Sequence, residues 1–190
     1  SEGHVEGDAF VTAGGAWTSG LVRQLGIRLP LQAGKGYHLR VDQPPAMPRH
    51  SYILMEGRVA VTPMGESVRF AGTMEIAGLD MNLNPARVRG IVRSAGRYLP
   101  DFTPAVFEKA SSWVGLRPCT PDGLPYIGPT RRIPNLILAT GHAMMGLSLG
   151  PITGKLVAEV LSGEAPSISL DQLAPERFDR RPAYPVRRGT

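Results

Sequence analysis

Arg117 has the chemistry to bind a charged ligand. It lies in the run Gly-Leu-Arg-Pro at residues 115–118. A guanidinium donates two parallel, charge-assisted hydrogen bonds to one carboxylate and thereby fixes the position and the orientation of that carboxylate. The carboxylate could belong to a ligand or to a nearby acidic residue such as Asp122. A lone arginine favours the structural ion pair, and ligand binding by Arg117 is the alternative.

The loop of residues 141–148 is a second candidate because it precedes a helix predicted over residues 147–162. The first amides of a helix have no partner within the helix and carry partial positive charge, so they favour a negatively charged group. Plain turn glycines between a strand and a helix would give the same pattern.

Other classes of chemistry find little support in the sequence. Cys119 is the only cysteine, and no Cys/His pair has the spacing of zinc ligands, so we expect neither a disulfide nor a metal site. No Ser/His/Asp or Cys/His arrangement indicates a nucleophile. The net charge is +5, but arginines concentrate in residues 176–190, which we interpret as a solvated tail and not as a nucleic-acid-binding surface.

The composition is that of a folded chain with many short elements. Hydrophobic residues make up 42% of the 190 residues, and the 23 glycines and 18 prolines predict frequent turns. No stretch is apolar enough for a membrane span, and no signal peptide is evident. Together with the single cysteine, these features favour a cytoplasmic location.

The two ends of the chain each predict a strand, a glycine turn and a helix. The first unit has a buried strand at 8–13 and a helix at 17–25, and the second has a buried strand at 135–140 before the helix at 147–162. Such units belong to layered α/β sheets, in which cofactors lie beyond the carboxyl ends of the strands.

The middle of the chain predicts an antiparallel sheet with one packed helix. Expected strands lie at 36–41, 52–55, 59–62 and 68–72. Asn84 and Pro85 predict a helix start, and apolar residues then recur at helical spacing up to Leu99. Residues 115–125 are rich in proline and glycine, which predicts an ordered loop. The whole is α+β, with the antiparallel sheet inserted between two α/β pieces.

Several motifs in the same order resemble the FAD-dependent D-amino-acid oxidase and dehydrogenase family. They are Gly-Leu-Arg-Pro at 115–118, Thr-Pro-Asp-Gly-Leu-Pro at 120–125, Ile-Gly-Pro at 127–129 and Ala-Thr-Gly-His at 139–142. Segments 71–78 and 82–85 are most similar to the small subunits of bacterial D-amino-acid dehydrogenases. The resemblance covers roughly residues 8–178.

The resemblance implies a domain organisation. Residues 1–29 and 119–165 would be pieces of a split FAD-binding domain, residues 30–118 the substrate domain, and residues 166–190 a basic tail. Family members also have a G-x-G-x-x-G turn for the FAD pyrophosphate, and this sequence has none. The chain therefore resembles the C-terminal portion of a longer enzyme, which is expected to be inactive without its missing N-terminal FAD-binding half.

The resemblance also implies roles for individual residues. Arg117 would bind the substrate carboxylate. Cofactor-binding residues would be Ala13, Gly14, Trp17, Gly141, His142, Met145, Gly146, Leu147 and Ser148, with no metal ligands. Ala143 departs from the family pattern, which commonly has glycine at that position.

The implied reaction is oxidation of D-amino acids to 2-oxo acids and ammonia by hydride transfer to flavin. An alternative is a glycine, sarcosine or imino-acid oxidase or dehydrogenase, because Ala60 occupies a strand position where some relatives carry a carboxylate-binding tyrosine. An alternative of another class is a non-catalytic binding or assembly module. The electron acceptor stays open, and the family also allows peripheral contact with the inner membrane.

Overall fold

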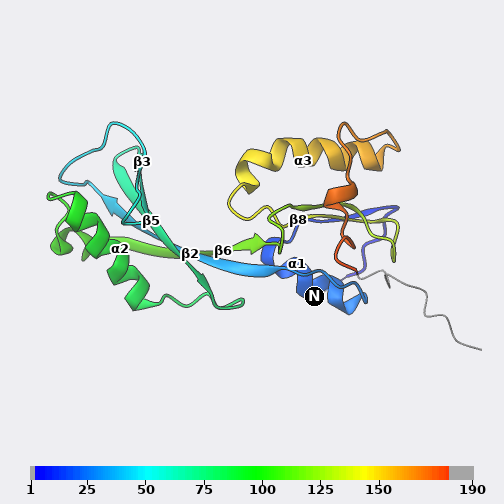
Figure 1. Ribbon diagram of the computed structural model, residues 1–190, viewed down its shortest axis with the longest axis horizontal. Coiled ribbons are helices and arrows are strands. Elements are labelled where there is room, and N and C mark those ends of the chain that lie inside the picture. The colour runs from blue at the N-terminus through cyan, green and yellow to red at the C-terminus, as the bar shows by residue number, and fades with distance from the viewer. Residues whose placement is uncertain (1–2, 180–190) are drawn as a thin grey trace, which may run out of the picture. The chain divides into compact units, whose positions relative to one another are not determined.

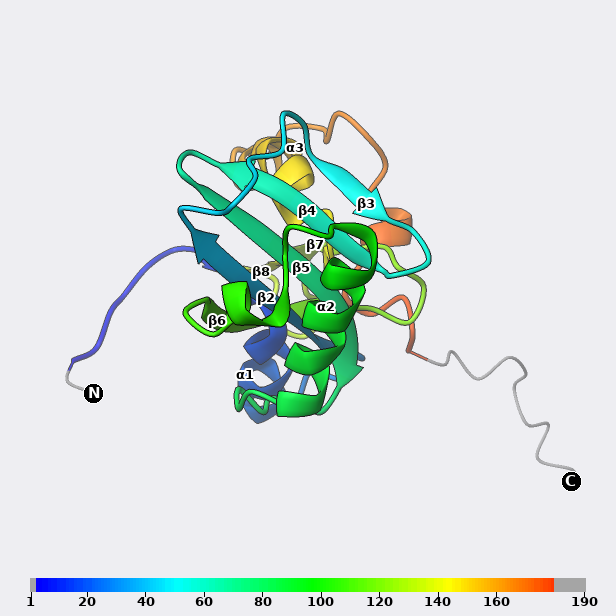
Figure 2. The same ribbon diagram turned by 90° about the vertical axis from the view of Figure 1, so that its left-hand side faces the viewer.

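The computed structural model describes residues 3–179 and contains two compact units (Figures 1 and 2). Residues 33–117 form one unit. The other comprises the described residues up to 32 and those from 118 onward.

The unit of residues 33–117 is built on a five-stranded sheet. The strands are β2 (Gln32–Asp42), β3 (Tyr52–Leu54), β4 (Val59–Met64), β5 (Ser67–Ile76) and β6 (Ser111–Cys119), in the order β3-β4-β5-β2-β6. The pairs β3–β4, β4–β5 and β2–β5 are antiparallel. The helix α2 (Pro85–Tyr98) packs against β4 and β5, and the short helix η2 (Pro104–Phe107) packs against α2. The predicted antiparallel sheet with a packed helix is confirmed.

The two faces of this sheet differ in character because side chains alternate along each strand. One face is apolar and packs beneath α2 and the segment that follows it (Figure 2). Tyr37, Leu39 and Phe70 lie on this face and are almost fully buried. The register places His38 opposite Ala71 and Arg40 opposite Arg69, so these polar side chains lie on the other face.

A β-bulge at Thr73 changes the face on which the following residues lie. Tyr37 pairs with Gly72 and Gly36 pairs with Met74, which leaves Thr73 as an extra residue with a φ of 66°. The extra residue reverses the alternation of β5 beyond this point. As a result, Glu75 lies on the same face as Tyr37, where the Tyr37 hydroxyl donates a hydrogen bond to its carboxylate.

The start of α2 is fixed by Asn84. Its side-chain oxygen accepts a hydrogen bond from the Ala86 amide at 3.0 Å, and its Nδ2 donates to Glu75 Oε1 at 3.1 Å. We expect Asn84→Ala to lower the free energy of unfolding by about 1–2 kcal/mol, because it removes the cap and leaves Glu75 one donor short. Asn84→Ser retains the cap acceptor and should recover about half of that loss. Thermal melts test this; equal melting temperatures for wild type and Asn84→Ala would contradict it.

The other unit contains a three-stranded sheet. Its elements are β1 (Phe10–Thr12), η1 (Gly15–Trp17), α1 (Thr18–Gln24), β7 (Tyr126–Pro129), β8 (Leu136–Thr140), α3 (Gly146–Leu161) and η3 (Asp171–Leu173). The strand order is β1-β8-β7, with β1 parallel and β7 antiparallel to β8. The long helix α3 packs against β7 and β8 (Figure 1). Val22, Tyr126 and Leu138 lie in the core of this unit and are fully buried.

Three local predictions are wrong. Phe10 and Val11 were expected in a buried strand, but they are 44% and 45% exposed because β1 lies at an edge of its sheet. Residues 115–119 belong to β6 and not to a loop, since β6 is an edge strand and an edge strand tolerates proline. Residues 126–129, which were not expected to be a strand, form β7.

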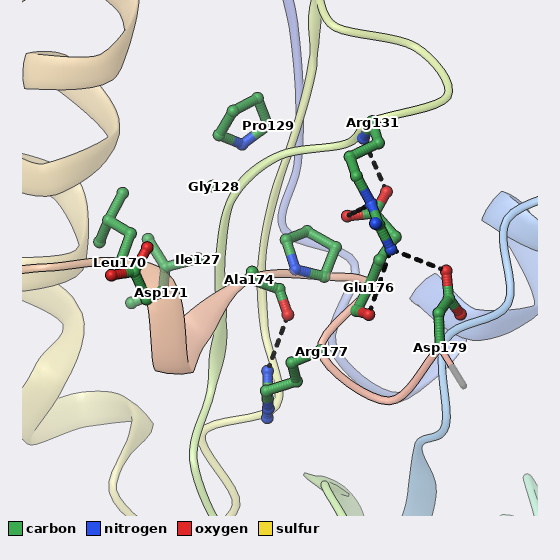
Figure 3. A pocket seen from close by; sticks show the side chains of 11 residues that line it. Ile127, Gly128, Pro129, Arg131, Leu170, Asp171, Ala174, Glu176, Arg177 and Asp179 are labelled. Carbon is green, nitrogen blue, oxygen red and sulfur yellow. Dashed lines mark hydrogen bonds and ion pairs between the residues drawn. The ribbon is translucent and has the colours of Figure 1, made fainter. Parts of the chain in front are cut away.

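A further correction concerns the start of the expected solvated tail, residues 176–179, which contacts the rest of its unit. The guanidinium of Arg177 lies over the Tyr126 ring, 4.1 Å from its centroid, and Phe178 packs edge-on against the same ring. Arg131 forms an ion pair with Asp179 at 3.1 Å (Figure 3). The remaining residues of the expected tail, 180–190, lie outside the described part of the chain.

Candidate functional site

The predicted cofactor-binding residues follow two neighbouring parallel strands. Ala13 and Gly14 come directly after β1, and Gly141 and His142 come directly after β8. Because β1 and β8 are parallel and paired, their carboxyl ends meet at one edge of the sheet. The Thr140 hydroxyl ties the two segments together by donating to the Gly15 carbonyl at 3.0 Å.

The loop after β8 has a tightly specified backbone. Gly141 has a φ of 87°, and a Cβ atom there would lie 2.6 Å from the Thr120 side chain, so this position requires glycine. The Ala143 amide donates to the Pro118 carbonyl at 2.9 Å, and the Met145 amide donates to the His142 carbonyl at 2.8 Å. These bonds set the path of the chain into α3.

The N-terminus of α3 has no side-chain cap among the described residues. The first amide of the helix that bonds back within the chain is that of Leu149, which donates to Met145. The preceding residues Gly146, Leu147 and Ser148 therefore present helix-start amides, and the Leu147 side chain is 96% exposed. A group with partial negative charge suits this helix start.

His142 has a positioning role within the loop. Its Nε2 lies 2.9 Å from Thr153 Oγ1, and the Thr153 hydroxyl itself donates to the Leu149 carbonyl at 2.8 Å. Since the hydroxyl proton is already used, Nε2 must be the donor to Thr153. Burial lowers the pKa of His142, which favours the neutral ring over the charged one. His142 thus joins the loop to the third turn of α3.

Trp17 lies at the end of η1 and is 53% exposed. Trp17 is therefore not a buried core residue. A large aromatic surface left open beside Ala13 and Gly14 is available to a ligand or to another segment.

The backbone at Ala143 has a φ of 47°, in the left-handed region, and this conformation suits glycine better than alanine. We expect Ala143→Gly to raise the free energy of unfolding by up to about 1 kcal/mol through relief of this strain, even though glycine makes the unfolded chain more flexible. The melting temperature should rise by about 2–4 °C. The control is Ala139→Gly in β8, which should destabilise by about 0.5–1 kcal/mol. A loss of stability in both variants would contradict the expectation.

Arg117 lies in the unit of residues 33–117, on β6. Its guanidinium lies over the backbone of Gly36, where an added Cβ atom would come within 1.7 Å of Nη1. Arg117 helps to line a cavity of ≈ 250 Å³ on the polar face of the sheet. The cavity residues are Gly36, Tyr37, His38, Arg69, Ala71, Trp113, Gly115, Leu116 and Arg117.

An aromatic stack forms one wall of this cavity. The rings of His38 and Trp113 are 5.1 Å apart and nearly parallel, at 24°. The Trp113 indole folds over Gly115, where an added Cβ atom would lie 2.1 Å from it. The two glycines of this region thus give room to the two large side chains that shape the cavity, the Trp113 indole and the Arg117 guanidinium. Ala60 lies one strand further out, opposite Ala71, and is not among the cavity residues.

Asp122 is not the partner of Arg117 that the structural alternative suggested. Asp122 Oδ2 accepts from Arg177 Nε at 2.8 Å, and its Oδ1 accepts from Arg177 Nη2 at 2.9 Å. This bidentate pair lowers the pKa of Asp122 to about 2. Both of its oxygens are therefore engaged with Arg177.

A buried ionic network supports the cavity from the other face of the sheet. Lys35 is 1% exposed and donates to Asp80 at 2.7 Å, and this hydrogen bond raises its pKa. Glu75 accepts from Tyr37, and this bond lowers the pKa of Glu75. Glu75 of segment 71–78 also accepts a hydrogen bond from Asn84 of segment 82–85, so the network joins the two segments.

Sequence reasoning missed Arg69, Lys35 and His38 as residues of the site region. Arg69 is the only charged residue in the expected strand at 68–72. A charged residue between the apolar Val68 and Phe70 indicates the face of the strand opposite to the core, and this was the available signal. Lys35 gave no signal, because its burial depends on Glu75 and Asp80 reaching it from distant segments.

A cavity of ≈ 680 Å³ in the other unit lies beneath the C-terminal segment (Figure 3). It is lined by residues of β7, η3 and segment 174–179, and none of the predicted site residues lines it. Its charged side chains Arg131, Glu176 and Arg177 are already engaged in hydrogen bonds. Among residues 3–179, no cluster of histidine, cysteine or acidic residues could hold a metal, and no helix has the length and apolar character to cross a bilayer.

Comparison with known proteins identifies the family. The family described as FAD dependent oxidoreductase (DAO) matches residues 1–160. The D-amino acid dehydrogenase of Xanthobacter autotrophicus is 39% identical over 90% of this chain and 40% of that protein. The D-amino-acid oxidase of Bradyrhizobium diazoefficiens is 38% identical over 93% of this chain and 42% of that protein.

Among solved structures, glycine oxidase from Geobacillus kaustophilus is similar with a TM-score of 0.79 and 28% identity, covering 90% of this chain and 45% of that one. The chain spans less than half the length of these relatives. The match over most of the chain, in sequence and in fold, shows that the chain belongs to the FAD-dependent oxidoreductase family DAO.

Proposed function

We propose that this chain is the C-terminal region of a longer enzyme that oxidises D-amino acids to 2-oxo acids and ammonia with FAD. The proposal rests on the position of the Arg117 guanidinium, which lies over Gly36 at the wall of a small cavity. The similarity to D-amino acid dehydrogenases supports the choice of substrate class.

In this proposal the three-stranded sheet is one piece of a split FAD-binding domain, and residues 33–117 form the substrate domain. The edge strand β1 supports it, because parallel sheets normally continue and are covered on both faces, whereas Phe10 and Val11 are exposed. Further strands from an N-terminal half, including a pyrophosphate-binding turn, would complete the sheet.

The residues that would hold the flavin ring are those of loop 141–148 and the turn at Ala13 and Gly14. The uncapped amides of Gly146 to Ser148 would donate to the electron-rich edge of the ring. Pro151 has no amide hydrogen, so it cannot donate to the Leu147 carbonyl as another residue in the helix would. The Leu147 carbonyl is therefore a hydrogen-bond acceptor that the same helix start offers. Bound FAD would accept the hydride from the substrate Cα.

Arg117 would bind the substrate α-carboxylate through both of its terminal nitrogens. Two hydrogen bonds fix the rotation of the substrate as well as its position, which directs one Cα–H bond. The stack of His38 and Trp113 forms one wall of the cavity beside Arg117. The pKa of His38 is lowered by burial, so its ring is neutral near neutral pH and does not compete for the carboxylate.

The half-exposed Cys119 fits a reducing compartment, which supports a cytoplasmic enzyme.

The test is to express the chain together with an N-terminal FAD-binding segment and to measure 2-oxo acid formation with an artificial electron acceptor. D-amino acids, L-amino acids, glycine, sarcosine and proline form the substrate panel. We expect D-amino acids to give the highest kcat/KM. A flavin-containing protein that turns over none of them would overturn the proposal, and a clear preference for glycine or sarcosine would replace it.

The chain of 190 residues is itself the control for cofactor binding. Because it lacks a G-x-G-x-x-G turn, we expect it to fold but to lose FAD on gel filtration. A stoichiometric flavin spectrum after gel filtration would contradict this.

A further inference from the structure

Positive charge gathers in the cavity of residues 33–117. Two of the side chains that line it are arginines, Arg69 from β5 and Arg117 from β6, and none of the lining residues is acidic. His38, between them on β2, has a pKa lowered by burial and by the nearby charge of Arg69, so the net charge comes from the two guanidinium groups.

Arg69 lacks a partner that would explain its place. Its Nε is buried and has no hydrogen-bond partner among residues 3–179, and no ion pair of Arg69 is found within that range. Arg40 lies directly opposite Arg69 in the register and is no partner, because it is itself a cation. No acidic side chain within that range therefore offsets the charge of the Arg69 guanidinium, so an anionic group in the cavity that Arg69 lines would be favoured.

The two arginines reach one cavity from two different strands. Arg117 lies over Gly36, and Arg69 lies across from Arg40, four residues further along β2. Four residues of strand correspond to about 13 Å. Both side chains line the same cavity of ≈ 250 Å³, so one small molecule in that cavity can lie against both of them.

We propose that Arg69 binds a second carboxylate, so that the cavity prefers amino acids with an acidic side chain to those with a neutral one. The inference rests on the proposed function, in which Arg117 holds the α-carboxylate. Arg69 is then a specificity-determining residue that contacts the far end of the substrate.

The test is direct binding to the 190-residue chain, measured by isothermal titration calorimetry. Glutarate and butyrate are the probes, because they differ by one carboxylate and neither can be oxidised as an amino acid. The variants are Arg69→Gln and Arg69→Lys, with Arg40→Gln as the matched control. Arg40 lies on the same face of the sheet but pairs with Asp42 and does not line the cavity.

We expect the wild type to bind glutarate at least about 10-fold more tightly than butyrate. Arg69→Gln should abolish this preference without changing butyrate binding, Arg69→Lys should retain part of it, and Arg40→Gln should retain all of it. Melting curves show whether each variant is folded. If Arg69→Gln is not folded, the glutarate preference of Arg69→Lys is compared with that of the wild type instead.

Equal affinity for both probes in the wild type, an equal loss of both in Arg69→Gln, or no binding of either probe would overturn the inference. The proposed function is tested separately by Arg117→Lys in the same titration. If Arg117→Lys leaves butyrate binding unchanged, the carboxylate role of Arg117 fails. If it weakens butyrate binding while glutarate shows no advantage in the wild type, only the role of Arg69 fails.

Discussion

Replacing Arg117 with alanine is expected to lower kcat/KM for D-amino acids by about a hundredfold or more in the complete flavoenzyme, with flavin content unchanged. The variant loses two charge-assisted hydrogen bonds, each contributing roughly 1.5–3 kcal/mol, and the substrate Cα–H is no longer held in one direction. Both kcat and KM should suffer. Steady-state kinetics and the flavin absorbance of the purified enzyme measure the two quantities.

Two further variants separate the charge of Arg117 from its position. Arg117→Lys keeps the charge but loses the paired geometry, so it should recover only part of the activity. Gly36→Ala leaves Arg117 in place in the sequence but puts a methyl group where its guanidinium lies, so it should reduce activity as well. Gly90→Ala in α2 is the control, since an added Cβ there meets nothing within 4 Å.

Near-normal kcat/KM in Arg117→Ala would show that the arginine is only structural. Loss of flavin together with early melting would show that residues 115–118 serve the architecture of the enzyme. Either result removes the carboxylate-binding role.

Replacing Arg177 with alanine is expected to destabilise the chain by roughly 2–4 kcal/mol. The guanidinium is 9% exposed, makes a bidentate pair with Asp122 and donates to the Leu124 carbonyl at 2.7 Å. The loss is placed below the 3–5 kcal/mol of a fully buried pair because Asp122 is 32% exposed and regains water. The melting temperature should fall by about 5–15 °C.

The control is Arg131→Ala. Arg131 also pairs with an acidic residue of the C-terminal segment, but it is 59% exposed, so its loss should cost about 1 kcal/mol or less. If both variants lower the melting temperature equally, the pair of Arg177 with Asp122 stabilises the chain no more than an ordinary surface ion pair does.

The pH dependence of stability tests the same pair. The pKa of Asp122 falls from an ordinary value of 3.8 to about 2 because of Arg177. A lowered carboxyl pKa stabilises the fold above the ordinary value, and this contribution is lost as pH falls toward the lowered one. Arg177→Ala should therefore lose less stability than wild type between these two pH values. Parallel curves would contradict the assignment.

Local patterns sufficed for the elements that local chemistry determines. The helix predicted from Asn84, Pro85 and the apolar periodicity is confirmed as α2, with the predicted cap. The strands of the antiparallel sheet and the strand–loop–helix unit of β8 and α3 are likewise confirmed. In each case the residues that fix the element are close together in the sequence.

Predictions failed where a distant partner decides the outcome. Arg177 has the sequence context of a solvated tail, yet it packs on Tyr126 and pairs with Asp122, more than fifty residues away. Residues 115–119 looked like a loop because proline and glycine rarely continue a strand. The edge position of β6 and the space that Trp113 takes over Gly115 are both tertiary facts.

The single extra residue at Thr73 helps to keep the polar face of the sheet positively charged. In an unbulged strand, the carboxylate of Glu75 would lie on the same face as Arg69 and would offset part of its positive charge. With the bulge, the Glu75 carboxylate instead lies on the opposite face, where it contacts Lys35 and Tyr37. A change of one residue in the length of β5 would thus alter which ligands the face attracts, with no substitution of any residue that lines the cavity. Length differences at this position should be considered alongside substitutions when substrate preference is compared among relatives.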